Sequence, residues 1–191
     1  MRRFTTLFTA LLATLLVTWL PTLPLQAAHA QDSAAATLAA QLAALINEER
    51  ARKGLALVPV SRSLSAVAEA HVRDLQAHPP SGACNMHSWS ANGAWTPCCY
   101  TADHAQARCM WVKPAEITGG VYRGDGFEIS VGGSARMTPA SALESWRGSS
   151  AHYTVIMSQG MWARSTWRAM GVGVSENYAV VWFGTEPDAG R

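Results

Sequence analysis

Apolar residues recur with helical spacing in two successive segments of the chain. In residues 38–53 they stand three and four positions apart, and Gly54 then supplies a C-cap. A second helix begins at a cap on Ser61 or Ser63 and stops before Pro79. Its inner face is expected to carry Leu64, Val67, Ala68, Val72 and Leu75. The pattern therefore predicts two amphipathic helices joined by a short apolar link.

The end of the chain has the alternating or apolar pattern of β-strands. Residues 169–175 and 178–183 flank the short turn at 176–177, which predicts a hairpin. Upstream, residues 126–129 precede a Gly-Gly turn at 132–133.

Another helix is expected between the Gly-Gly turn and the hairpin. Thr138 and Pro139 suit its first turn, Trp146 lies on it, and a Gly-Ser-Ser turn at 148–150 ends it. His152 follows, at the start of a β-favouring run. A histidine at such a junction is expected to face a cleft.

Residues 81–126 show no sustained pattern and predict a long loop rich in Gly, Trp and Cys. A loop of this length in a compact domain needs a function or cross-links. It contains all four cysteines, namely Cys84, Cys98, Cys99 and Cys109. The vicinal pair is not expected to bond to itself, which leaves 84–98 with 99–109, or 84–99 with 98–109. A structural zinc is the alternative, but no Cys-x-x-Cys pair exists.

The N-terminus has the pattern of a secretory signal peptide. Arg2 and Arg3 precede an apolar run over 7–25, and Ala28-His29-Ala30 offers small residues for cleavage before Gln31. We therefore expect a signal peptide over 1–30, a flexible leader over 31–37, and one domain over 38–191. A retained membrane anchor is the alternative, although two prolines interrupt the apolar run. The expected location is the periplasm or the exterior, where disulfides form.

The net charge of the chain argues against one class of partner, nucleic acids. Removal of residues 1–30 takes away two arginines and no acidic residue, so 15 basic against 13 acidic residues becomes 13 against 13. The mature surface then has no net positive charge to favour nucleic acid. We expect no nucleic-acid partner, and no stable membrane anchor after cleavage.

Two motifs carry a resemblance to a known family. The first is Asn47-Glu-Glu-Arg50 followed by Gly54, with His71-x-x-Asp74-Leu on the second helix. The second is Trp146-x-x-Ser-x-x-His152. Together they resemble the bacterial branch of the CAP superfamily, the SCP domain shared by cysteine-rich secretory proteins, antigen 5 and plant pathogenesis-related proteins. The resemblance covers residues 38–77 and 126–184. It implies an α+β fold, a three-layer α-β-α sandwich, with a disulfide-bonded insertion at 84–126.

The resemblance also implies a central cavity lined by His87, Glu128, Ser149 and His152. His87 matches because it stands in a His-Ser pair after the second helix, whereas His78 lies too close to that helix. The family's usual Glu-Asn pair reads Glu128-Ile here, and Ser149 replaces its second acidic residue.

Two imidazoles and a carboxylate with an open position suit zinc or another divalent cation. The expected ligands are His87, Glu128 and His152, which are also the candidates for acid–base catalysis. A buried polar cluster with satisfied hydrogen bonds is the alternative. Because Ser149 replaces a potential base, we expect binding rather than turnover.

The sequence thus predicts a secreted binding module for a small apolar ligand, a glycan or an extracellular protein. The alternative is a metal-assisted hydrolase that uses His87, His152 and Glu128. Two further groups are expected to be structural. His71 is interpreted as a packed core histidine, and Trp89, Trp95 and Trp111 as a small core beneath the disulfides rather than a ligand groove.

Overall fold

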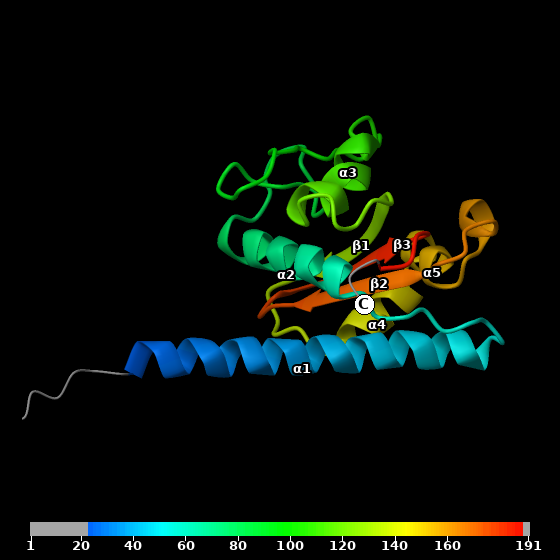
Figure 1. The fold of residues 1–191 in the computed structure, drawn as a ribbon, viewed down its shortest axis with the longest axis horizontal. Helices are drawn as coiled ribbons and strands as arrows, with labels where there is room; N and C mark the ends of the chain where they lie inside the picture. The colour runs from blue at the N-terminus through cyan, green and yellow to red at the C-terminus, as the bar shows by residue number, and fades with distance from the viewer. Residues whose placement is uncertain (1–22, 189–191) are drawn as a thin grey trace, which may run out of the picture.

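The helices and strands of the chain form three layers (Figure 1). The structure is a computed structural model, and residues 23–188 are described. The middle layer is a sheet of β1 (Gly126–Gly132), β2 (Ala169–Val174) and β3 (Tyr178–Gly184). One face is covered by α1 (Leu23–Arg52), α4 (Pro139–Arg147) and α5 (Ser150–Ile156), with the short η1 (Gly160–Trp162) nearby. The other is covered by α2 (Arg62–Ala77) and α3 (Ala107–Ile117). The expected α-β-α sandwich is confirmed.

The sheet is antiparallel and has the strand order β1-β3-β2. The expected hairpin is confirmed as β2 and β3, and β1 pairs with the other edge of β3, placing Glu128 opposite Trp182. Two glycines in β2 let α2 approach closely. A Cβ on Gly171 would overlap the backbone of Leu64, as one on Gly173 would overlap that of Ala68.

Apolar side chains fill the space on both sides of the sheet. We call the side that packs on α1, α4 and α5 the α1 face. Its fully buried residues include Leu42, Ile46, Trp146, Ile156, Val181 and Phe183. We call the side that packs on α2 and α3 the α2 face, where they include Leu64, Val67, Ala68, Val180 and Trp182. Burial of a large apolar side chain stabilises the fold by about 1.5–3 kcal/mol.

The Asn-Glu-x-Arg motif of α1 fixes the link to α2. Asn47 donates to the carbonyl of Val58 and accepts from its amide, at 3.0 and 2.8 Å. The buried Arg50 guanidinium donates to the carbonyls of Ala56 and Ile156. These bonds satisfy backbone groups that no helix or strand pairs, so the motif has a structural role. Ser61 caps α2 as expected, accepting from the amide of Leu64.

Two predicted segments differ in the structure. Residues 31–37 were expected to be a flexible leader, but they lie within α1. Alanine has the highest helix propensity, and the run Ala34-Ala-Ala extends the helix toward the N-terminus. Residues 1–22 lie outside the described residues, so the signal peptide and its cleavage stay predictions. No helix among residues 23–188 is long and apolar enough to cross a membrane.

The segment of His152 was expected to be a strand, and this was wrong, because it forms α5. Ser149 is the N-cap residue of this helix. Val155 and Ile156 are then buried on the α1 face, while the Tyr153 hydroxyl donates to Glu49 at 2.7 Å. Tertiary packing here outweighs the strand preference of the run Tyr-Thr-Val-Ile.

The insertion is cross-linked as expected, but it is not all loop. Of the two pairings left open, the structure has Cys84–Cys99 and Cys98–Cys109. It also contains α3, a helix interrupted by Pro114 and lacking a side-chain N-cap, which explains why no pattern indicated it. Trp89 belongs to the main cluster of the α2 face rather than to a separate small core, although Trp95 and Trp111 remain partly exposed.

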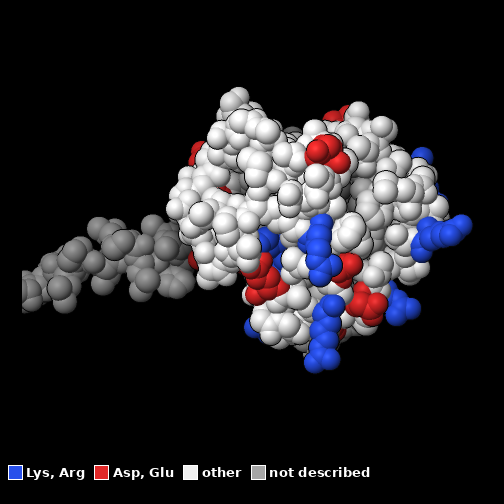
Figure 2. Space-filling model, turned by 90° about the horizontal axis from the view of Figure 1, so that it is seen from above, with Lys and Arg blue, Asp and Glu red and all other residues white. Residues whose placement is uncertain are grey.

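The first part of the insertion carries no charged side chain. No Lys, Arg, Asp or Glu stands between Asp74 and Asp103. Figure 2, seen from above the molecule as drawn in Figure 1, shows a wide uncharged area with basic and acidic residues interspersed beside it. A continuous basic stripe of the kind that binds a phosphate backbone is not visible on this face.

Candidate functional site

His87 lies at the start of the insertion, between a disulfide and the buried residue Ser88. Its amide donates to the side chain of Asn85 at 3.0 Å, and the Cys84–Cys99 bridge holds the chain three residues before it. Its ring meets that of Tyr100 edge-on, with 5.2 Å between the centroids. The side chain is 18% exposed, so His87 is held in a defined orientation while still reaching solvent.

Glu128 lies in the middle of β1, and its side chain is fully buried. Nδ1 of His87 lies within hydrogen-bond distance of its Oε2, at 2.9 Å. Nδ1 of His71 lies 2.6 Å from its Oε1. Both oxygens of the carboxylate therefore face imidazole rings, one from the insertion and one from α2.

His71 is the residue of this group whose role sequence reasoning missed. It was expected to be a packed core histidine, and it is indeed fully buried and stacked on Trp89, with 4.2 Å between the centroids. Its Nε2 also bonds to the carbonyl of Ser88 at 3.0 Å, while Nδ1 faces Glu128. The available signal was a histidine on an apolar helix face with an acidic residue, Asp74, three positions later.

Asp74, the second polar residue of that helix motif, also binds the insertion. Its buried carboxylate accepts from the amide and the hydroxyl of Ser90, at 2.8 and 2.5 Å. His71 thus binds the carbonyl of Ser88, and Asp74 binds the amide and the hydroxyl of Ser90. Both serines follow closely after His87 in the chain. His71 and Asp74 hold the segment of the insertion that carries the site against α2.

The charge of Glu128 is balanced by its neighbours. Burial raises the pKa of this carboxyl, but the His71 and His87 rings outweigh it, so the net pKa lies below the ordinary value. Burial and the charge of Glu128 raise the pKa of Tyr100, which stays a neutral phenol. Glu128 is therefore an anion held inside the protein by two imidazoles.

His152 lies within electrostatic range of this pair. Burial and the nearby His87 lower the pKa of His152, and the Glu128 charge opposes them. Among the described residues, no hydrogen bond joins His152 to either of them, and the Ser149 side chain makes no capping bond. His87 and Glu128 thus meet directly, whereas a single cavity shared with Ser149 and His152 stays a prediction.

The expected set of three metal ligands does not fit this geometry. Within residues 23–188, no three His, Cys, Asp or Glu residues are grouped as a metal site. Both oxygens of Glu128 already face imidazole rings, those of His71 and His87, which disfavours an additional contact with a cation. A cation would have only the imidazoles of His87 and His152, and zinc binding by that pair stays a prediction.

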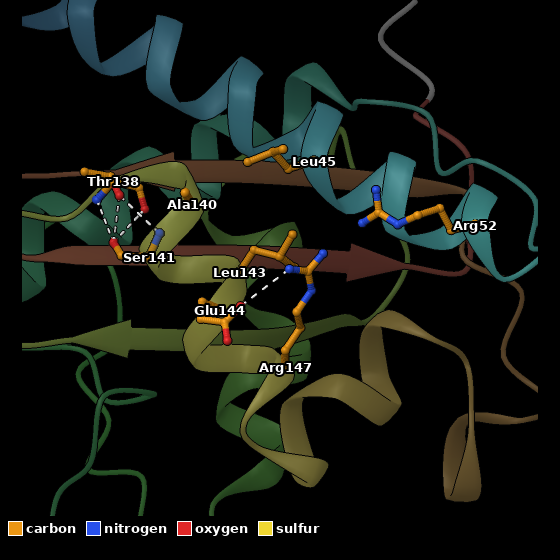
Figure 3. A pocket seen from close by; sticks show the side chains of 8 residues that line it. All are labelled: Leu45, Arg52, Thr138, Ala140, Ser141, Leu143, Glu144 and Arg147. Carbon is orange, nitrogen blue, oxygen red and sulfur yellow. Dashed lines mark hydrogen bonds and ion pairs between the residues drawn. The ribbon is translucent and has the colours of Figure 1, made fainter.

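Two hollows lie elsewhere on the surface. One, of about 600 Å³, lies between α1 and α4 (Figure 3). It is lined by Leu45, Arg52, Thr138, Ala140, Ser141, Leu143, Glu144 and Arg147. The other, of about 360 Å³, lies between the end of α2 and the insertion, beside Trp89 and Pro97. Neither is lined by His87, Glu128, Ser149 or His152.

Comparisons with solved structures agree with the fold. An extracellular protein containing an SCP domain from Bacillus anthracis is 16% identical, with a TM-score of 0.60 over 87% of this chain and 45% of that chain. A cysteine-rich secretory protein from Staphylococcus aureus is 15% identical, with a TM-score of 0.52 over 80% of this chain and 40% of that chain. This chain thus spans less than half of either neighbour's length.

Sequence comparison identifies the family. A search of curated proteins finds no match. The model of the CAP family, described as the cysteine-rich secretory protein family, matches residues 43–184. That match includes α2, the insertion, the sheet and all the residues of the candidate site. The chain belongs to the CAP family of cysteine-rich secretory proteins.

Proposed function

We propose that this CAP domain is an exported binding module whose ligand contacts His87 and His152. One observation carries the proposal: Glu128 is enclosed and paired with two imidazoles, so the accessible polar groups at the site are rings rather than an acid–base pair. Hydrolysis needs a base within reach of water or substrate. The arrangement therefore supports recognition of a ligand better than turnover.

The chemistry of the site suits a neutral ligand. Nε2 of His87 has no hydrogen-bond partner among the described residues, and the ring is partly exposed. The insertion contributes the Tyr100 ring, which meets His87 edge-on, and no charged residue stands between Asp74 and Asp103 in the sequence. A small apolar molecule with a polar end, or a neutral glycan, matches these groups.

The test uses the exported protein and three probes: zinc chloride, a soluble neutral oligosaccharide and a medium-chain fatty acid. We expect at least one probe to shift the side-chain NMR signals of His87 and His152, and the shift to disappear in His87→Ala. Binding that is unchanged in both His87→Ala and His152→Ala would place the ligand elsewhere. Hydrolysis of a p-nitrophenyl ester that depends on His87 would favour the metal-assisted hydrolase instead.

Zinc binding has its own pH test. An imidazole must be neutral to bind a cation. Because the pKa of His152 lies below its usual 6.5, this ring stays available at neutral pH, and zinc affinity is expected to fall as the pH drops below about 6.5. Titration calorimetry at pH 7.5 and 5.5 measures this. If titration with zinc at pH 7.5 gives no heat of binding, the zinc hypothesis is wrong and the neutral-ligand proposal remains.

Export is tested separately. If residues 1–30 are a cleaved signal peptide, the N-terminus of protein collected outside the cytoplasm is expected at or near Gln31. Its intact mass should rise by four hydrogens on reduction, because both disulfides are formed. Retention of residues 1–30 with free thiols would contradict export of a disulfide-bonded domain.

A further inference from the structure

A continuous row of polar contacts runs from the backbone of the insertion through α2 and β1 to His87. Nε2–H of His71 donates to the carbonyl of Ser88, Nδ1 of His71 meets Oε1 of Glu128, and Oε2 lies 2.9 Å from Nδ1 of His87. His71 and Glu128 are buried from solvent, and only His87 reaches the surface. The row therefore links a buried histidine to an accessible one.

The contact between His71 and Glu128 requires a proton. Because Nε2 carries the hydrogen bonded to Ser88, an ordinary neutral imidazole would have a lone pair on Nδ1. That lone pair would lie 2.6 Å from a carboxylate oxygen, in a region without solvent, where the two would repel. The contact lies outside hydrogen-bond angles, and neither atom has another partner, so charge attraction holds it. The pair therefore carries one proton more than a neutral imidazole and a carboxylate.

This additional proton decides the state of His87. With Oε1 facing the proton, the carboxylate keeps Oε2 as an acceptor, and Nδ1 of His87 must donate to it. The Ser130 hydroxyl, 3.5 Å from the same nitrogen, is too distant to compete. Nε2 of His87 then keeps its lone pair and points away from Glu128.

We propose that His71 is a positioning residue that acts through Glu128 to fix His87 as the Nδ1–H tautomer. The accessible Nε2 is then an electron-pair donor, which selects ligands with a hydroxyl or amine hydrogen over anionic ligands. The ligand class rests on the proposed function, whereas the tautomer does not. His71 also orients the chain at Ser88, so one residue of α2 sets both the place and the tautomer of His87.

The first measurement uses the unaltered protein without a ligand. Long-range nitrogen–proton NMR spectra at neutral pH distinguish a protonated from an unprotonated ring nitrogen. We expect Nδ1 of His87 to be protonated and Nε2 unprotonated, and both nitrogens of His71 to show protonated shifts. If His87 carries its proton on Nε2, the proposal fails without any variant being made.

The second measurement removes His71. In His71→Phe, stacking on Trp89 is retained, but Glu128 loses its buried partner and is expected to take up a proton. The carboxyl then donates to Nδ1 of His87, and the major tautomer should change to Nε2–H. The exposed histidine at the end of α2 gives the matched control, His78→Phe, which should leave His87 as Nδ1–H.

A conservative change separates positioning from packing. In Glu128→Gln, neutral His71 accepts from the side-chain amide nitrogen, which turns the amide oxygen toward His87 and preserves the Nδ1–H tautomer. Adding His71→Phe to Glu128→Gln should release the amide and give a mixture of both tautomers.

A folded His71→Phe variant that keeps Nδ1–H on His87 would overturn the role of His71. If His71→Phe does not fold, the spectra of the unaltered protein and of Glu128→Gln still decide, because loss of Nδ1–H in either contradicts the proposal. None of these spectra needs a ligand. Failure of all three binding probes would thus count against the proposed function and leave the tautomer result unaffected.

Discussion

The two faces of the sheet differ in what they bury. The α1 face buries a mostly apolar cluster together with two charged residues of α1, Arg50 and Glu49, and Glu49 accepts from Arg147 of α4 and Tyr153 of α5. The α2 face also buries His71, Asp74, Ser88, Lys113 and Glu128. The two disulfides lie on this second side as well.

This difference indicates a division of roles. Buried polar groups stabilise a fold only when their partners are in place, and an unpartnered group costs about 1–3 kcal/mol. The α2 face is therefore the place where His87 can be held, but it is less favourable for stability than an apolar interface of equal size. The disulfides offset part of that cost by restricting the unfolded chain.

The largest expected effect is on the α1 face. Trp146 is fully buried there, and its Nε1 donates to the carbonyl of Ser130. Trp146→Ala should lower the free energy of unfolding by about 3–5 kcal/mol, through the lost apolar contact and the cavity. Urea denaturation measures this. The control Trp111→Ala, at a residue 38% exposed on α3, should cost about 1 kcal/mol or less. Equal losses in the two variants would mean that the α1 face is not the main source of stability.

The next effect concerns the insertion. Replacing Cys98 and Cys109 by serine should cost about 2–4 kcal/mol, because the bridge restricts the unfolded chain. In hydrogen exchange, the segment 84–111 should lose protection before α1 does. The insertion joins the core through Trp89 and Tyr100, so these two residues should keep more protection than the rest of the segment. Simultaneous loss of protection over the whole domain would show that the two faces unfold as one unit.

A smaller, pH-dependent effect is expected at the rim of the α1 face. Hydrogen bonds from Arg147 and Arg52 lower the pKa of Glu49 to about 2, although burial opposes them. Because the pKa is lower in the folded state, the stabilisation is present above the unfolded value near 4.5 and is lost as the pH falls toward 2. Glu49→Gln should therefore cost about 1–2 kcal/mol at pH 7 and much less near pH 2. A cost independent of pH would assign the effect to packing.

The smallest effect is expected at one of the two accessible histidines of the site, His152. His152 is only partly buried and makes no hydrogen bond within the described residues, so His152→Ala should change the free energy of unfolding by about 0.5 kcal/mol or less. His87→Ala removes a partner of a buried carboxylate and should cost about 1–3 kcal/mol. Thermal denaturation compares the two. A larger loss in His152→Ala would mean that it, rather than His87, is tied to the α2 face.

Periodicity and caps predicted individual helices and the hairpin, and the family resemblance implied the sandwich. The apolar spacing of α2, its Ser61 cap and the hairpin of β2 and β3 are local features, and each was found where it was expected. The failures were also local. Residues 150–156 and α3 carry strand-favouring residues or an internal proline, and only contacts with distant segments make them helical.

The site was only partly predictable. Family resemblance selected His87 and Glu128, and the structure joins them. No sequence pattern showed that His71 shares the same carboxylate, because α2 and β1 are separated by the whole insertion and their packing depends on the fold. The disulfide pairing likewise depended on how the insertion folds, and periodicity carries no information about it.

The account depends on Glu128 lying between two histidines instead of facing a ligand. A high-resolution crystal structure of the exported protein at neutral pH, with and without soaked zinc, tests this directly. We expect both carboxylate oxygens within about 3 Å of the His71 and His87 rings in both crystals, and any zinc on imidazole nitrogens alone. A carboxylate of Glu128 bound to zinc, or turned toward solvent with His71 no longer facing it, would contradict the account.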